Sequence, residues 1–101
     1  MKHREELEKI IKRYGPKSQI DVAIEEMSEL TKALIKYRRA KDSGDSADEL
    51  GKRRGEIEEE IADVQIMLNQ LQIIYRNEGP VEAWVDYKVE RQMQRISEME
   101  V

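Results

Sequence analysis

The chain of 101 residues has no cysteine and no phenylalanine, and it has only two prolines and five glycines. Without cysteine it forms neither disulfides nor a thiol nucleophile, which is compatible with a reducing compartment. No apolar run approaches the length of a membrane span, and residues 1–6 lack the pattern of a secretory signal. We therefore expect a cytoplasmic protein with no membrane partner.

Several catalytic arrangements are also missing. There is no glycine-rich phosphate loop and no serine or cysteine nucleophile with a base, and the single histidine, His3, lies near the first residue. Charge is abundant but balanced, with 18 basic against 22 acidic residues and a net charge of −4. This balance gives no electrostatic reason to expect nucleic acid as a partner.

The residues that are present favour helices. Charged residues make up 40% of the chain, and Glu, Lys, Arg, Leu and Ile are abundant. Residues 1–101 are predicted to form one domain, which is small for burying a core alone. Long helices with modest apolar stripes in so short a chain predict that subunits share a core. We expect an all-α fold, with a four-helix bundle-like subunit that assembles into a homo-oligomer.

Apolar residues three and four positions apart predict the first two helices. The first covers about residues 5–14 and ends at the pair Gly15-Pro16. Ser18 is the predicted N-cap of the second helix, which runs to about residue 39. The continuous apolar stripe of this second helix comprises Ile20, Ala23, Ile24, Met27, Leu30, Leu34 and Tyr37.

Residues 41–46 have the composition of a loop and separate the second helix from a third. The third helix begins near Ser46, is expected to fray at Gly51 and Gly55, and continues to about residue 76. Its predicted buried face comprises Ile57, Ile61, Val64, Met67, Leu68, Leu71 and Tyr75.

The fourth predicted helix covers about residues 81–99. Gly79 is placed near the C-cap of the third helix, and Pro80 suits the first turn of the fourth. One face of the fourth helix carries Val81, Val85, Val89 and Ile96.

Two pairs of acidic residues are each spaced three residues apart on a long predicted helix. Glu26 and Glu29 form the first pair, and Glu60 and Asp63 form the second. Glu60 falls inside the apolar arc of its helix, where an unpaired carboxylate is unfavourable. Four acids that converge from packed helices repel one another unless protons or a cation neutralise them. Because Mg²⁺ prefers oxygen ligands, we predict a Mg²⁺ site here, with Mn²⁺ as a substitute.

A basic stripe follows the last helix. Lys88, Arg91 and Arg95 succeed Trp84 at steps of four, three and four residues. Cations of this kind hold phosphate oxygens during phosphoryl transfer. Acids on two helices and bases on another therefore indicate a polyphosphate ligand that carboxylate-bound Mg²⁺ would clamp.

The two motifs Glu26-x-x-Glu29 and Glu60-x-x-Asp63, within the segments EEMSEL and EEIADV, resemble those of the MazG family of all-α nucleoside triphosphate pyrophosphohydrolases. The resemblance extends over residues 19–95. It implies Mg²⁺-dependent hydrolysis of (deoxy)nucleoside triphosphates to monophosphates and pyrophosphate, for nucleotide-pool sanitation or control. It also implies a homodimer or homotetramer with active sites near the subunit contacts.

The resemblance makes Glu26, Glu29, Glu60 and Asp63 the metal ligands. Glu25 or one of these four, Glu29 among them, would orient the attacking water, and the choice stays open. The catalytic candidates are therefore Glu25 and Glu29.

The resemblance also assigns the substrate-binding residues. Lys88 and Arg95 match the family's phosphate-holding cations, and Arg91 is a third candidate. Gln19 resembles a residue that lies near the base or sugar. The chain departs from the family's pattern in a long connector between the motifs and in Gln92, where an asparagine is often found.

Two other functions fit the same residues. An enzyme similar to phosphoribosyl-ATP pyrophosphohydrolase would share the architecture and differ in its product. A helical oligomerisation or adaptor module without catalysis would leave the acids solvated and would use Trp84 for packing. Base and sugar preference, the number of metal ions and the choice between dimer and tetramer stay open.

Overall fold

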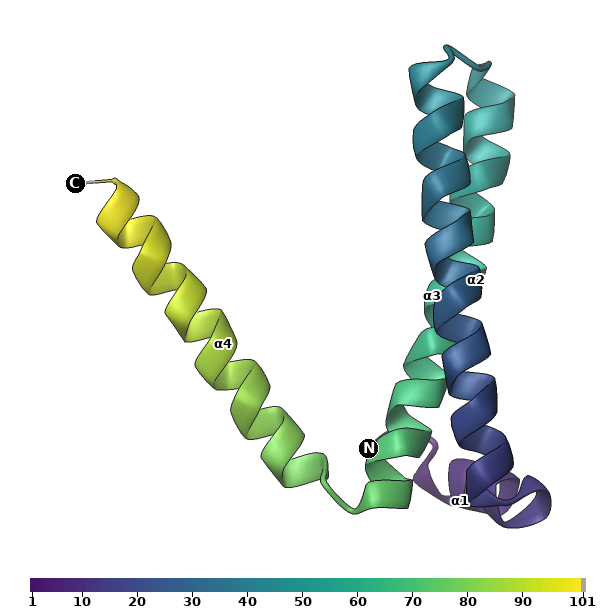
Figure 1. Ribbon diagram of the computed structural model, residues 1–101, viewed down its shortest axis with the longest axis vertical. Helices are drawn as coiled ribbons and strands as arrows, with labels where there is room; N and C mark the ends of the chain where they lie inside the picture. Colours follow the sequence, from purple (N-terminus) through teal and green to yellow (C-terminus); the bar gives the residue numbers. More distant parts are fainter. Residues whose placement is uncertain (101) are drawn as a thin grey trace.

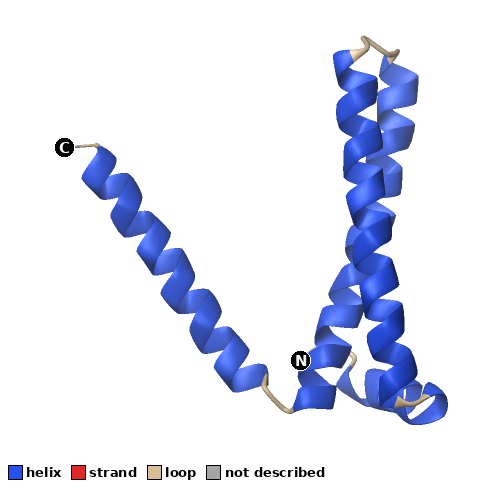
Figure 2. Ribbon diagram, in the orientation of Figure 1, coloured by secondary structure: helices blue, strands red, loops and turns tan. Residues whose placement is uncertain are grey.

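The structure is a computed structural model and describes residues 1–100. Over these residues the chain is all-α, with four helices and no strand, as its composition predicts (Figure 2). The helices are α1 (Arg4–Tyr14), α2 (Pro16–Asp42), α3 (Ala47–Tyr75) and α4 (Glu78–Met99). Within the described residues, no helix combines the length and the apolar character that crossing a membrane requires.

α2 and α3 form a long antiparallel hairpin, and α1 packs against both helices at the end of the hairpin that lies away from its loop (Figure 1). The buried apolar side chains of α2 are all small, whereas those of α1 and α3 are longer. The buried apolar residues are Leu7 and Ile11 of α1, Ala23, Ala33 and Ala40 of α2, and Met67 of α3.

Gly15 joins α1 to α2 in a sharp turn. Its φ of 91° is readily adopted only by glycine, and its backbone N–H donates to the carbonyl oxygen of Ile11 at 2.8 Å. α2 then begins at Pro16, whose fixed φ suits the first helical position. The prediction that Ser18 caps α2 is therefore wrong, because Ser18 lies within the first turn of the helix.

Ser46 caps α3, since its Oγ accepts a hydrogen bond from the backbone N–H of Glu49 at 3.2 Å. The prediction of fraying at Gly51 and Gly55 is wrong, because α3 is continuous through both residues. Packing along α2 supports this segment. An ion pair between Arg53 Nε and Glu49 Oε1, 3.3 Å apart, also bridges the first of the two glycines.

The break between α3 and α4 falls at Arg76 rather than near Gly79. Arg76 adopts the left-handed conformation, with φ 53°, and its N–H donates to the carbonyl oxygens of Gln72 and Ile73. A left-handed residue other than glycine costs roughly 1 kcal/mol. Gly79 lies inside the first turn of α4 together with Pro80, so its predicted role near the C-cap is wrong and that of Pro80 is confirmed.

α4 projects away from the hairpin and contacts α3 only near the point where it begins (Figure 1). No residue of α4 is buried. Its predicted apolar face is accordingly open to solvent, with Val85 53% and Val89 58% exposed. A bundle-like packing of all four helices is therefore not formed within the described chain.

The chain exposes more surface than a compact monomer of its size. Its accessible area is 8178 Å² at a mass of 11.9 kDa, for which about 5,900 Å² is typical. Its radius of gyration is 17.6 Å, against about 13 Å for a compact chain of this length. Six residues of the predicted apolar stripe of α2 and the predicted buried face of α3 are exposed in the single chain: Ile24, Met27, Leu34, Ile61, Leu68 and Tyr75.

Candidate metal centre

Three of the four predicted metal ligands converge between α2 and α3. One carboxylate oxygen from each of Glu26, Glu60 and Asp63 lies within 4.8 Å of the other two, and all three residues are half-buried. Glu26 belongs to α2, and the other two lie one turn apart on α3. The antiparallel hairpin brings the motifs together because each lies at the same number of residues from the loop.

Glu60 Oε2 is buried and has no hydrogen-bond partner. Buried polar atoms in folded proteins are nearly always paired, because an unpaired acceptor loses its hydration without compensation. No basic side chain of the described residues forms an ion pair with Glu26, Glu60 or Asp63. An unpaired, buried carboxylate oxygen beside two further carboxylates has the character of a cation site.

The cluster disfavours its own negative charge. Burial raises the pKa of Glu26 above its ordinary value, and the charges of Asp63 and Glu60 raise it further. Burial also raises the pKa of Glu60, to which the charges of Asp63 and Glu29 add. A bound divalent cation would act in the opposite direction, because it favours the ionised form of each carboxylate.

Glu29, the fourth predicted ligand, lies just outside the cluster. Its charge acts on Glu60, but its Oε1 lies 3.4 Å from Lys32 Nζ on the same helix. An exposed lysine pair of this kind is weak, so a side-chain rotation can release the carboxylate of Glu29. Glu25 is exposed on α2, and its charge contributes to the raised pKa of Glu26.

The residues present fit Mg²⁺. Ligand oxygens lie about 2.1 Å from this ion, so two of them stand at most about 4.2 Å apart. The three carboxylate oxygens lie within 4.8 Å of one another, so they would have to move closer together to hold the ion at this spacing. The donors are all carboxylate oxygens, which suit a hard cation, and three of them leave positions for water and phosphate oxygens.

A pair of glutamines lies further along the hairpin. Gln19, predicted to lie near the base or sugar of a nucleotide, is only 6% exposed in the single chain. Gln70, at the matching level of α3, is 2% exposed, and its Oε1 has no hydrogen-bond partner. The sequence motifs did not single out Gln70. Its signal was the one that identified Glu60, namely a polar residue inside an apolar arc.

The predicted phosphate-holding cations lie on α4, apart from the acidic cluster. Lys88 Nζ lies 5.9 Å from the ring centre of Trp84, and Arg91 Cζ lies 5.6 Å from that of Tyr87. The two rings meet edge to face, with their centres 5.9 Å apart. Because α4 projects away from the hairpin, these cations and Arg95 lie apart from the acidic cluster of the same chain (Figure 1).

Comparison with known proteins adds no assignment. No family model matches the chain, and no curated protein and no solved structure matches it significantly. The relation to the MazG family therefore stays a prediction that depends on the two acidic motifs. The function has to be argued from the chemistry of the site.

Proposed function

We propose that the protein is a Mg²⁺-dependent nucleoside triphosphate pyrophosphohydrolase that converts (deoxy)nucleoside triphosphates to monophosphates and pyrophosphate. The observation that carries this proposal is the convergence of Glu26, Glu60 and Asp63 from two helices, with a buried oxygen of Glu60 left unpaired. The resemblance of the two acidic motifs to the MazG family supports the same reaction. The proposed role is sanitation or control of the cytoplasmic nucleotide pool.

Each carboxylate has a stated task in this proposal. Glu26, Glu60 and Asp63 would hold Mg²⁺, and Glu29 would join them after it leaves Lys32. The ion, when bound, neutralises phosphate oxygens and increases the electrophilicity of the phosphorus under attack. Glu29 or the exposed Glu25 would accept a proton from the attacking water, and both lie next to the cluster in α2.

We further propose that the protein is a homodimer or homotetramer in which α4 of one copy packs on the hairpin of another. α4 has 22 residues and none of them is buried, whereas helices in proteins gain most of their stability from packing an amphipathic face. The chain exposes about 2,300 Å² beyond a compact monomer, which exceeds the roughly 800 Å² that each partner buries in a standard interface. The exposed stripes of α2, α3 and α4 supply apolar surface for such a contact.

The same assembly would bring the basic residues of α4 close to the acidic cluster, from which they are separated within one chain. Within residues 1–100, Lys88, Arg91 and Arg95 form no ion pair with an acidic side chain. A second copy offers these cations the carboxylates of its hairpin, and a triphosphate would lie between the two charges. The site for phosphate is therefore proposed to be complete only in the oligomer.

A second candidate function is an oligomerisation or adaptor module without catalysis. The extent of exposed apolar surface favours it, because large apolar surfaces mark protein interaction sites whether or not a reaction follows. A third candidate, an enzyme similar to phosphoribosyl-ATP pyrophosphohydrolase, uses the same site and differs only in its substrate.

One experiment separates the three functions. Release of pyrophosphate and of phosphate is measured across canonical and modified nucleoside triphosphates and phosphoribosyl-ATP, each with and without Mg²⁺. We expect pyrophosphate from at least one nucleoside triphosphate, only with Mg²⁺. Pyrophosphate from phosphoribosyl-ATP alone would favour the third candidate. No release from any substrate, and no thermal shift with Mg²⁺ and a non-hydrolysable triphosphate, would favour the module.

A further inference from the structure

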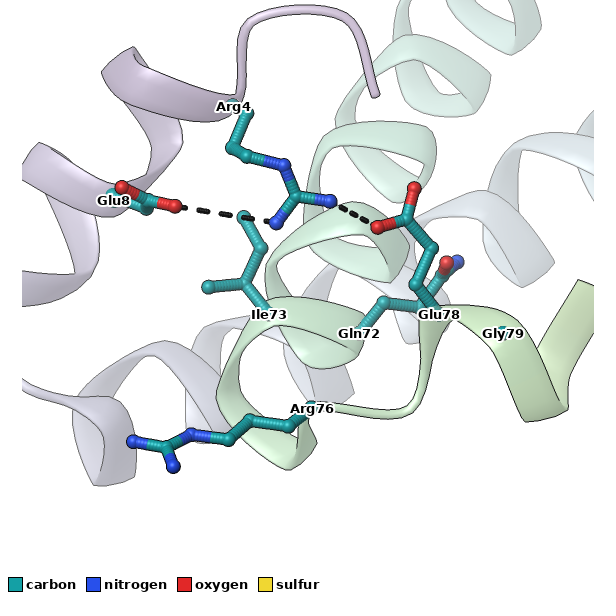
Figure 3. Close-up of a pocket in the computed structure, with 7 residues that line it drawn as sticks. All are labelled: Arg4, Glu8, Gln72, Ile73, Arg76, Glu78 and Gly79. Carbon is teal, nitrogen blue, oxygen red and sulfur yellow. Dashed lines mark hydrogen bonds and ion pairs between the residues drawn. The ribbon is translucent and has the colours of Figure 1, made fainter.

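Two features connect α4 to the rest of the chain: a short backbone turn, and ion pairs formed by Glu78, the first residue of α4. The backbone turns at Arg76 and Asn77, directly before Glu78. Within residues 1–100, every ion pair that α4 forms involves Glu78. The guanidinium group of Arg4 in α1 donates to Glu78 Oε2 (Figure 3), and the amino group of Met1 lies 3.9 Å from Glu78 Oε1.

Apolar packing does not hold the first turn of α4. No residue of α4 is buried, and its backbone approaches neither α1 nor α2. An open cavity of about 520 Å³ lies beside the ion pair. Its lining is mostly polar and consists of Arg4, Glu8, Gln72, Ile73, Arg76, Glu78 and Gly79 (Figure 3).

The two partners of the ion pair differ in how firmly they are placed. Arg4 begins α1, which is fixed on the hairpin by the buried side chains of Leu7 and Ile11. Glu78 begins α4, where a carboxylate is also favoured by the positive end of the helix dipole. The ion pair therefore connects a well-packed helix to one that has no packing of its own.

We propose that the Arg4–Glu78 ion pair is a clasp that sets the direction of α4 relative to the α2–α3 hairpin. A helix of 22 residues is about 33 Å long, so a rotation of about 10° at its first turn moves its far end by about 6 Å. α4 carries both the apolar stripe and the basic residues, so its direction decides where they meet a second copy. Arg4 and Glu78 are thus positioning residues. The clasp stands on the geometry of the single chain and does not depend on the proposed hydrolysis.

Exchange of the two charges tests the clasp directly. Because the chain has no cysteine, Ser43→Cys at the hairpin loop and Ser97→Cys near the end of α4 accept nitroxide labels selectively. Double electron–electron resonance then measures the distance between the labels, with labelled chains diluted in excess unlabelled protein so that only distances within one chain contribute. The variants are Arg4→Glu, Glu78→Arg and the double exchange.

We expect each single variant to broaden the distance distribution and shift its centre. We expect the double exchange to restore it in part, because Glu78→Arg also places a cation near the amino group of Met1. Glu8→Gln is the matched control, because Glu8 Oε1 lies 4.0 Å from Arg4 Nη1 but makes no ion pair with α4. This control should leave the distribution unchanged. Unchanged distances in both single variants would overturn the proposal, and so would a double exchange whose distribution is no closer to that of the unsubstituted pair than those of the single variants.

A second measurement keeps the test decisive if a single variant loses helical circular dichroism. The distance distribution of the labelled protein with Arg4 and Glu78 intact is measured at low salt and at 1 M salt. At 1 M salt the screening length falls to about 3 Å. Glu78→Gln is measured at low salt. A clasp predicts that high salt and Glu78→Gln each broaden the distribution. A distribution that stays narrow under both conditions contradicts it.

Discussion

α2, α3 and α4 are all long, charge-rich amphipathic helices, but they differ in how much of their apolar surface is packed. Within the described residues, α2 and α3 bury side chains against each other and against α1, whereas no residue of α4 is buried. In the hairpin, Glu60 lies where burial and neighbouring acids oppose its charge. On α4, Lys88 and Arg91 are exposed to solvent and lie over aromatic rings, an arrangement that favours a positive charge. A charged side chain whose surroundings oppose its charge is therefore informative about function, whereas a solvated one is not.

The same difference separates two kinds of stability. The hairpin gains its stability from contacts between α2, α3 and α1, whereas α4 has no buried residue and, in the proposed oligomer, would gain its stability from a second copy. Changes in the acidic cluster should therefore alter chemistry and leave assembly intact. Changes in the apolar stripe of α4 should alter assembly first.

The largest expected effect comes from Glu60→Gln, which tests the hairpin half of this comparison. Loss of a metal ligand should reduce pyrophosphate release by at least about 100-fold. The metal-free protein should fold as well or better, because a buried repulsion is removed. Glu58→Gln, at an exposed position of the same helix, is the control. Unchanged activity of Glu60→Gln would remove this residue from the metal site.

The next effect concerns assembly and comes from Val85→Asp combined with Val89→Asp. Two unpaired charges on the apolar stripe of α4 should weaken self-association by at least about 100-fold. Multi-angle light scattering should then report a monomer, while most of the helical circular dichroism persists. Gln94→Asp, on the opposite side of α4, should leave the mass unchanged. An oligomer that survives the double substitution would contradict docking through this stripe.

A smaller effect is expected for Lys88→Ala, which asks whether the solvated cations of α4 have a function at all. If Lys88 holds phosphate, KM for the triphosphate should rise roughly 10-fold, which corresponds to about 1.4 kcal/mol. The dissociation constant for Mg²⁺ alone should stay the same. Lys12→Ala in α1 serves as the control. Equal losses in triphosphate and Mg²⁺ affinity would count against a phosphate role for Lys88.

The smallest effect is the pH dependence of stability without Mg²⁺. The pKa values of Glu26 and Glu60 are raised in the folded protein above an ordinary value of 4.5, so their ionised forms destabilise the folded state. This destabilisation is present at neutral pH, is relieved as pH falls through the raised values, and is gone below about 4.5. The gap in unfolding free energy between the wild type and a Glu26→Gln, Glu60→Gln double variant should therefore narrow between pH 7 and 4.5. A constant gap in denaturant titrations would contradict the raised pKa values.

The sequence predicted the number, order and type of the helices because its apolar spacing and turn residues agree with one another. It failed at particular boundaries. Arg76 ends α3 in the left-handed conformation, which arginine has no intrinsic preference to adopt. Gly79 was the expected residue near the C-cap of α3, but it lies inside α4. Likewise, Ser18 resembles a cap, but the combination of Gly15 and Pro16 starts α2 earlier.

The acidic part of the candidate site was predictable from the sequence, because it lies within the α2–α3 hairpin. Glu26 and Asp63 lie at equal distances from the loop, and Glu60 lies one helical turn from Asp63. Antiparallel pairing of the two helices about this loop is therefore enough to bring the three residues together. The position of α4 was not predictable, because its direction depends on long-range contacts such as that between Arg4 and Glu78. Spacing within a helix carries no information on such contacts.

The central claim is that the carboxylates which meet between α2 and α3 bind a divalent ion. Crystals grown with Mn²⁺ and a non-hydrolysable triphosphate allow the ion to be located by its anomalous scattering. We predict a peak between α2 and α3, ligated by oxygens of Glu26, Glu60 and Asp63. A map with no peak there, with the three side chains turned into solvent, would contradict the claim.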